Sequence, residues 1–236
     1  MSVDESGQGE QVITYSATPQ AIFENRHDAG RRLAVELREY NDQSVVVLAI
    51  PNGGVPVALE VASALNADLD LVISRKIPMP FNPEAGFGAI ADDGTIILNE
   101  EIVKRISLSR QQIEYEASKV RAEIKQRSIL YRGDWPLVEV SGKTVIIIDD
   151  GLASGFTMMA AVESVRHRRP REIVVAAPCA SAIALKQLKK VADKVVTYSI
   201  GFMPRFAVAD FYRYWHDLND NEVIRYLNQW RMRHLR

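Results

Sequence analysis

The 236-residue sequence predicts an α/β protein with a parallel central sheet flanked by helices. Short runs of branched apolar residues recur along the chain and are separated by longer segments with helical spacing. Strands that alternate with helical segments are typical of βαβ units, whose strands are parallel. A hydrophobic content of 47% over this length is enough for the core of one domain. We therefore expect a single domain over residues 21–236, preceded by a flexible segment over residues 1–20.

The first half of the chain supplies the first alternating elements. A helix is expected over residues 29–40, because Ala29, Leu33 and Leu37 recur at helical spacing. Pro51 and the two glycines that follow Asn52 should end the first strand. The expected order is then a strand at 45–50, a helix at 55–65 and a strand at 69–74.

The middle of the chain combines a proline-rich stretch, a hairpin and a long helix. Residues 78–83 contain three prolines, so residues 74–83 are expected to end the preceding strand as a loop. Asp92-Asp93-Gly94 between two apolar runs predicts a hairpin of 87–91 with 95–98. The longest helical pattern covers 109–130. The remaining expected elements are strands at 145–148, 173–177 and 195–200, and helices from 158, at 180–191 and at 220–230.

One stretch, Val145 to Thr157, carries the strongest functional signal. Four branched apolar residues predict a strand that is buried on both faces. Two aspartates follow where that strand ends, and a loop of small and hydroxyl residues leads into a helical pattern. Free backbone amides at a helix start form an anion site, and glycines let a ligand approach the backbone. Because carboxylates repel phosphate, the two aspartates suit sugar hydroxyls or a metal-bound water.

This stretch closely resembles the PRPP-binding fingerprint of type I phosphoribosyltransferases, where PRPP is phosphoribosyl pyrophosphate. The resemblance extends over most of the chain and implies the fold of that family, with a small hood and lid region. It implies transfer of the phosphoribosyl group from PRPP to a nitrogenous base or other nucleophile, with release of pyrophosphate. It assigns the 5′-phosphate of PRPP to Gly151, Leu152, Ala153, Ser154, Gly155, Phe156 and Thr157. Asp149 and Asp150 are the implied catalytic carboxylates that fix the ribose diol.

The resemblance also implies a pyrophosphate site and a cofactor. It places pyrophosphate on the loop of Asn52, Gly53 and Gly54, where a cis peptide is common in the family. Arg75 and Lys76, at a strand's carboxyl end, are the implied catalytic cations that stabilise the leaving pyrophosphate. Mg²⁺ is expected as the cofactor, held mainly by substrate and water, with no direct protein ligand beyond Asp149 and Asp150.

Two further features concern the lid and the acceptor. The resemblance implies a mobile lid over residues 78–87, with Glu84 as a lid contact. Purine salvage enzymes for hypoxanthine and guanine carry a carboxylate at the position of Ala153, so that chemistry is disfavoured here. Relatives usually carry an arginine at the position of Asn52, and a neutral amide forfeits a charged phosphate contact. The alternative function is therefore a non-catalytic regulatory protein that binds PRPP or a nucleotide.

Composition narrows the remaining choices. The net charge of −1 argues by bulk electrostatics against nucleic acid as a partner. The single cysteine, Cys179, fits a reducing cytoplasmic location. No apolar run approaches the length of a membrane span. The expected partners are thus small molecules, PRPP and a base, and a homodimer is an assembly that the sequence leaves open.

Overall fold

The computed structural model describes residues 14–16, 21–203 and 205–234. Most of the segment predicted to be flexible, residues 1–20, lies outside these described residues. Within it, Thr14–Ser16 form a short strand, β1, which the sequence did not predict. β1 pairs in parallel with β9 (Lys194–Gly201) at one edge of the main sheet.

The main sheet has six parallel strands in the order β1-β9-β8-β7-β2-β3, which confirms the predicted fold class. The remaining strands are β2 (Val45–Ala49), β3 (Asp68–Leu71), β7 (Thr144–Ile148) and β8 (Glu172–Ser181). β7 lies between β2 and β8, and all five of its residues are buried. The strand that precedes the two aspartates therefore lies in the middle of the sheet, as its continuous apolar run predicted.

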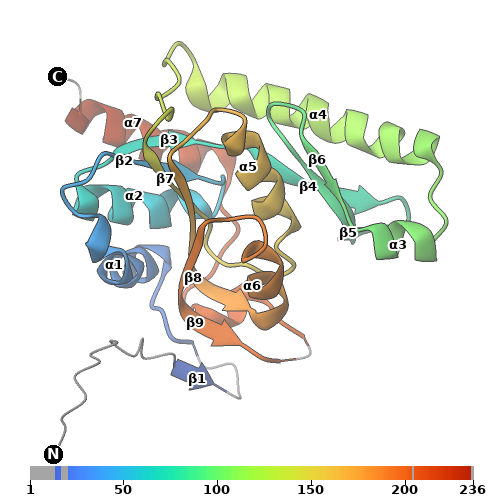
Figure 1. The fold of residues 1–236 in the computed structure, drawn as a ribbon, viewed down its shortest axis with the longest axis horizontal. Helices are drawn as coiled ribbons and strands as arrows, with labels where there is room; N and C mark the ends of the chain where they lie inside the picture. The colour runs from blue at the N-terminus through green and yellow to red at the C-terminus, as the bar shows by residue number, and fades with distance from the viewer. Residues whose placement is uncertain (1–13, 17–20, 204, 235–236) are drawn as a thin grey trace, which may run out of the picture.

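Helices cover both faces of this sheet (Figure 1). One face packs against α1 (Arg26–Glu36), α2 (Gly54–Leu65) and α7 (Asp220–His234), and Val47 and Ile146 point into this core. The other face packs against α5 (Phe156–Arg166) and α6 (Ala182–Leu188), with Leu48 and Ile147 in a second core. The alternation follows from the period of two along each strand. Short 3₁₀ helices occupy Arg38–Tyr40 and Val208–Phe211.

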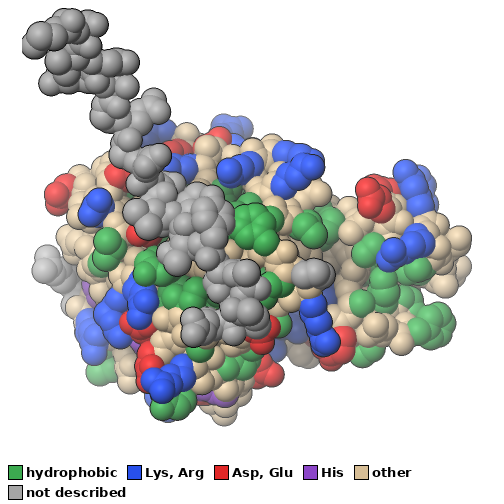
Figure 2. Space-filling model, turned by 90° about the horizontal axis from the view of Figure 1, so that it is seen from below, with side chains coloured by type: hydrophobic (Ala, Val, Ile, Leu, Met, Phe, Trp, Pro, Cys, Tyr) green, Lys and Arg blue, Asp and Glu red, His purple; other side chains and the backbone are tan. Residues whose placement is uncertain are grey.

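A second sheet forms an arm that projects from the main body (Figures 1 and 2). It contains the antiparallel strands β4 (Ser74–Met79), β5 (Asn82–Ala91) and β6 (Ile96–Leu98), followed by α3 (Glu100–Arg105). Pairing of β5 with β6 confirms the predicted hairpin. The prediction of an unpaired proline-rich loop at 74–83 was wrong, because β4 and β5 pair through this stretch.

The prolines are tolerated because of where they stand in the arm. β4 is an edge strand of its sheet, so the missing N–H of a proline does not interrupt a second neighbour. The pairing register also shifts on either side of Pro78, which is the irregularity that a missing donor favours. Pro83 lies in the middle strand, β5, but before the residues of β5 that pair with β6. The prolines therefore do not exclude a paired hairpin here.

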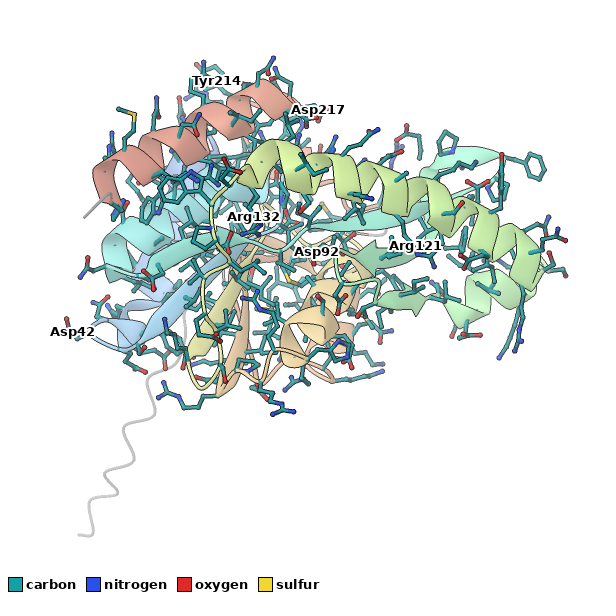
Figure 3. All side chains as sticks on the ribbon, turned by 90° about the horizontal axis from the view of Figure 1, so that it is seen from above. Asp42, Asp92, Arg121, Arg132, Tyr214 and Asp217 are labelled. Atoms are coloured by element: carbon teal, nitrogen blue, oxygen red, sulfur yellow. The ribbon has the colours of Figure 1, made fainter. Side chains whose placement is uncertain are left out.

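The long helix α4 (Arg110–Arg132) joins the arm to the main body, as seen from above in Figure 3. Ser109 and Gln112 form a capping box at its start. At its other end Arg132 donates to both carboxylate oxygens of Asp70 in β3, at 2.8 and 3.0 Å. This contact fixes the carboxyl end of α4 to the edge of the main sheet.

The surface shows no dominant charge on the face drawn in Figure 2, where basic and acidic side chains are interspersed. This distribution agrees with the net charge of −1. Within the described part of the chain, none of the helices combines the length and apolarity that crossing a bilayer requires.

Candidate functional site

A cavity of about 430 Å³ lies at the carboxyl end of β7. The loop between β7 and α5 forms one wall, with every residue from Gly151 to Met158 in contact with the cavity. The opposite wall comes from the arm and α3, through Lys76, Glu84, Gly86, Gly88, Asn99 and Ile102. Carboxyl ends of parallel strands are where ligands bind in open α/β sheets, so this is the expected position for a site.

The loop is held at both ends by local packing. Leu152 is buried and bridges to Ala180, and its N–H donates to the Cys179 carbonyl at 2.9 Å. Gly155, at φ +83°, provides the left-handed backbone from which α5 begins. Phe156 packs against a small cluster of alanines that includes residues of β5. These contacts anchor the loop along the cavity, which it lines with the small residues Gly151, Ala153 and Ser154.

The loop provides the groups that an anion needs. The amides at the start of α5 have no intrahelical acceptors, and the helix dipole adds partial positive charge there. Ser154 and Thr157 also line the cavity. The Thr157 carbonyl accepts from the Ser74 hydroxyl at 2.9 Å, which ties the start of α5 to the arm. The predicted phosphate loop, residues 151–157, is therefore assembled as one surface.

The two aspartates after β7 face different surroundings. Asp149 lines the cavity, and one of its oxygens accepts from the N–H of Asp150 at 2.8 Å. Asp150 instead accepts from Nε of Arg26 in α1 at 2.7 Å, with both side chains largely buried. The guanidinium of Arg26 lies 3.8 Å from the ring centroid of Trp215 and donates to the His216 carbonyl. In this structure Asp150 is thus held in an ion pair, and Asp149 is the carboxylate that faces the cavity.

The protonation of this pair is set by burial and mutual repulsion. Burial raises the pKa of the Asp149 carboxyl well above its usual range, and the charge of Asp150 raises it further. Burial also raises the pKa of Asp150, while Arg26 acts in the opposite direction. The ionised form of Asp149 is therefore the less stabilised of the two, because the Arg26 ion pair belongs to Asp150. Asp149 is also the carboxylate that lines the cavity.

A second cavity, of about 410 Å³, adjoins the first and shares Lys76, Asp149 and Thr157 with it. Arg75 and Pro51 line this second cavity, together with residues of α4. Arg75 forms an ion pair with Glu123 of α4 at 3.2 Å. Lys76 donates to the Glu84 carbonyl at 2.6 Å. Both predicted cations therefore line this second cavity.

The loop after β2, residues 51–54, packs closely against the end of β7. The peptide bond between Pro51 and Asn52 is cis, as the family resemblance implied. A Cβ on Gly53 would collide with the Asp150 carboxylate, and one on Gly54 would lie 2.6 Å from the Ile148 carbonyl. The glycine pair therefore lets α2 begin directly against the end of β7. Neither glycine lines the two cavities described above.

The side chain of Asn52 is engaged within the protein and does not line either cavity. Its Nδ2 donates to the Leu218 carbonyl at 2.7 Å and to Asp220 at 3.3 Å. Its Oδ1 accepts from Arg127 and from the Tyr131 hydroxyl, both at 2.9 Å. The amide thus ties the loop to α4 and to the start of α7.

Sequence reasoning missed three contributors to the site. Two of them are arginines: Arg26 forms an ion pair with Asp150, and Arg127 donates to Asn52. Each arginine is far from its partner in sequence. Asn99 lines the first cavity from the arm, and its own side chain caps α3 by accepting from the Ile102 N–H. An arginine on a helical face carries no signal of an ion pair 124 residues away.

The carboxylates present fit a hard cation that is shared with a substrate. Among the described residues no group of three His, Cys, Asp or Glu side chains is placed to hold a metal ion. Asp149 is the carboxylate common to both cavities, and carboxylate oxygen is a ligand that Mg²⁺ prefers.

Comparison with known proteins gives consistent matches. A family model described as phosphoribosyl transferase domain matches residues 20–210. A protein with the provisional name phosphoribosyl transferase, from two strains of Mycobacterium tuberculosis, is 36% identical over 208 residues. That match covers 88% of this chain but 47% of the relative, so the chain spans about half the relative's length. A crystal structure from Thermus thermophilus is 36% identical with a TM-score of 0.73, covering 88% of this chain and 98% of that one.

Proposed function

This chain belongs to the phosphoribosyl transferase domain family, and on that basis we propose that it transfers the 5-phosphoribosyl group of PRPP to a nucleophile. In this reaction the bond between C1 of the ribose and the pyrophosphate oxygen breaks, and C1 bonds to the nucleophile, which loses a proton. The proposal rests on two adjoining cavities that share Asp149: the loop of residues 151–157 lines the first, and Arg75 and Lys76 line the second beside the acidic Glu116 and Glu123.

The first cavity suits the 5′-phosphate of PRPP. Backbone amides of residues 151–157 and the start of α5 offer donors with a favourable dipole. The hydroxyls of Ser154 and Thr157 offer two more. The ribose would then extend toward Asp149, whose carboxylate accepts hydrogen bonds from a diol. Such contacts would also favour ionisation of a carboxyl whose pKa is otherwise raised.

The second cavity suits the pyrophosphate group. Arg75 and Lys76 provide positive charge where the leaving group gains negative charge, which is the interaction that lowers the barrier. The side chains of the Arg75–Glu123 ion pair are 33% and 54% exposed, and the pair is correspondingly weak. A pyrophosphate can therefore displace Glu123 at small cost.

Mg²⁺ would enter with the substrate. It would neutralise charge on the leaving group when bound. Asp149 is the residue of this chain placed to hold a water of its hydration shell or the ion itself, because it lines both cavities.

The acceptor is a nitrogenous base in this proposal. Ala153 offers no general base at the position where hypoxanthine–guanine enzymes carry one.

A second candidate function is that of a regulatory protein that binds PRPP or a nucleotide without turnover, and one observation favours it. Asn52 gives the pyrophosphate loop no cation, and its side chain is engaged elsewhere.

Pyrophosphate release separates the two candidates. The protein is mixed with PRPP, Mg²⁺ and each member of a panel of purine and pyrimidine bases, and pyrophosphate is measured with time. The transferase predicts release that depends on one base or a small group of bases. The regulator predicts saturable PRPP binding with no base-dependent release from any member of the panel.

A further inference from the structure

The loop after β2 contains no basic residue, but Arg127 of α4 lies beside it. The polar atoms of the Asn52 side chain are engaged, with Leu218, Asp220, Arg127 and Tyr131. Asn52 is therefore a structural link, and its amide is not free to bind a phosphate. Its Oδ1 accepts from the guanidinium of Arg127 at 2.9 Å, which puts a permanent positive charge at the loop.

Arg127 retains donors for a ligand. A guanidinium has five N–H donors. Among the described residues, Arg127 directs them to Asn52 and, at 3.5 Å, to Asp220. Its side chain is 24% exposed, so it is neither buried in the core nor fully solvated. Arg127 itself lines neither cavity, but it lies one helical turn beyond Glu123, which lines the second. A partly exposed guanidinium with unused donors is suited to a bidentate phosphate contact.

A second cation lies close to Arg127. Arg75 lines the second cavity, and burial together with the charge of Arg127 lowers the pKa of Arg75. Two guanidinium groups that repel one another are stabilised when an anion with several charges binds between them. Glu123, one helical turn before Arg127, pairs with Arg75 in the structure. α4 therefore places the cation Arg127 at the loop after β2. It also places Glu123, an anion that a ligand can displace, beside Arg75.

We propose that Arg127 of α4 binds the pyrophosphate group of the substrate and supplies the positive charge that Asn52 does not give to the loop. This inference rests on the proposed function, because it assigns a residue to the pyrophosphate end of that same site. It implies that the cation stands on the helix beside the loop and not in the loop itself. The activity of N52R alone would then not show whether the wild-type loop lacks a required cation. The new guanidinium of N52R would lie against that of Arg127 and repel it.

The variants that test this are R127A, Y131F and the double variant N52R/R127A. Y131F is the matched control, because the Tyr131 hydroxyl donates to the same Asn52 and Asp220 oxygens but carries no charge. The probes are Mg²⁺ with inorganic pyrophosphate, and ribose 5-phosphate, each titrated by calorimetry. Thermal unfolding of every variant separates lost binding from lost structure.

We expect R127A to weaken pyrophosphate binding by about ten- to a hundredfold, the range for one hydrogen bond to a charged group. Ribose 5-phosphate binding should stay within about twofold of wild type, a change too small to represent a lost hydrogen bond. Y131F should lower thermal stability and leave pyrophosphate affinity within about threefold. N52R/R127A should recover most of the affinity that R127A loses.

Four outcomes overturn the proposal. If folded R127A binds pyrophosphate as wild type does, Arg127 is not a ligand. If Y131F weakens pyrophosphate binding as much as R127A does, Arg127 acts only by holding Asn52 in place. If wild type binds ribose 5-phosphate but not pyrophosphate, the inference fails while the phosphate-loop part of the proposed function stands. If wild type binds neither probe, the proposed function and this inference fail together.

Discussion

Replacing Arg26 by methionine should destabilise the protein strongly, because it leaves the charge of Asp150 without its partner. The ion pair is short, at 2.7 Å, and its side chains are only 8% and 13% exposed. Removing one partner of a buried pair costs about 3–5 kcal/mol, since the remaining charge is desolvated and unpaired. For a chain of this size that corresponds to a fall in melting temperature of roughly 6–20 °C.

The loss should depend on pH in a defined direction. Without Arg26, the pKa of Asp150 should rise further, because the largest opposing influence is removed. A carboxyl with a raised folded-state pKa destabilises the fold at pH values above its unfolded-state pKa, because the unfolded chain releases the proton more readily. The free energy of unfolding of R26M should therefore fall furthest below that of wild type at neutral pH. The difference should shrink as the pH falls toward the range where Asp150 is protonated.

Urea denaturation at several pH values measures this free energy of unfolding. The double variant R26M/D150N is the control, because it removes both charges and should recover most of the stability that R26M loses. A free energy of unfolding for R26M within about 1 kcal/mol of wild type at neutral pH would show that the Asp150 charge does not depend on Arg26 for its stability.

Three further predictions concern groups around the cavities. D149N should raise the melting temperature at neutral pH and lose that advantage in acid, because burial and Asp150 disfavour the ionised Asp149; an unchanged melting temperature at neutral pH would count against this. Chymotrypsin should cut first after Phe81, which is 97% exposed between β4 and β5, and PRPP should slow that cleavage; identical rates with and without PRPP would count against the mobile lid over residues 78–87 that the family resemblance implies. E123Q should tighten pyrophosphate binding up to about fivefold by freeing Arg75 from a weak ion pair; weaker binding would show that Glu123 assists the site.

Local patterns in the sequence were sufficient to predict the main sheet apart from β1, and the loop that follows β7. The unbroken apolar run before Asp149 predicts a strand buried on both faces, and β7 lies inside the sheet. The small residues after it predict a loop that admits a ligand, and residues 151–158 line a cavity. Both features are encoded by neighbouring residues, so one window of sequence is enough to find them.

Contacts between distant segments could not be predicted in the same way. The partner of Asp150 is Arg26 on α1, and Asn52 meets residues of α4 and α7. No short window contains both members of such a pair. The paired hairpin at 74–91 was missed for another reason. Pro78 lies in an edge strand with a shifted register, and Pro83 lies in a part of β5 that does not pair with β6, so neither proline prevents the pairing.

The proposed function depends above all on PRPP binding by the loop of residues 151–157 together with Asp149. Calorimetric titration of PRPP into the wild-type protein with Mg²⁺ tests it most directly, with D149N as the matched variant. Asp149 is preferred to Asp150 for this purpose, because a change at Asp150 would also break the ion pair with Arg26. We expect saturable binding by wild type and binding at least about tenfold weaker by D149N, the loss expected for a charged hydrogen-bond acceptor. Absence of PRPP binding to folded wild-type protein would contradict it.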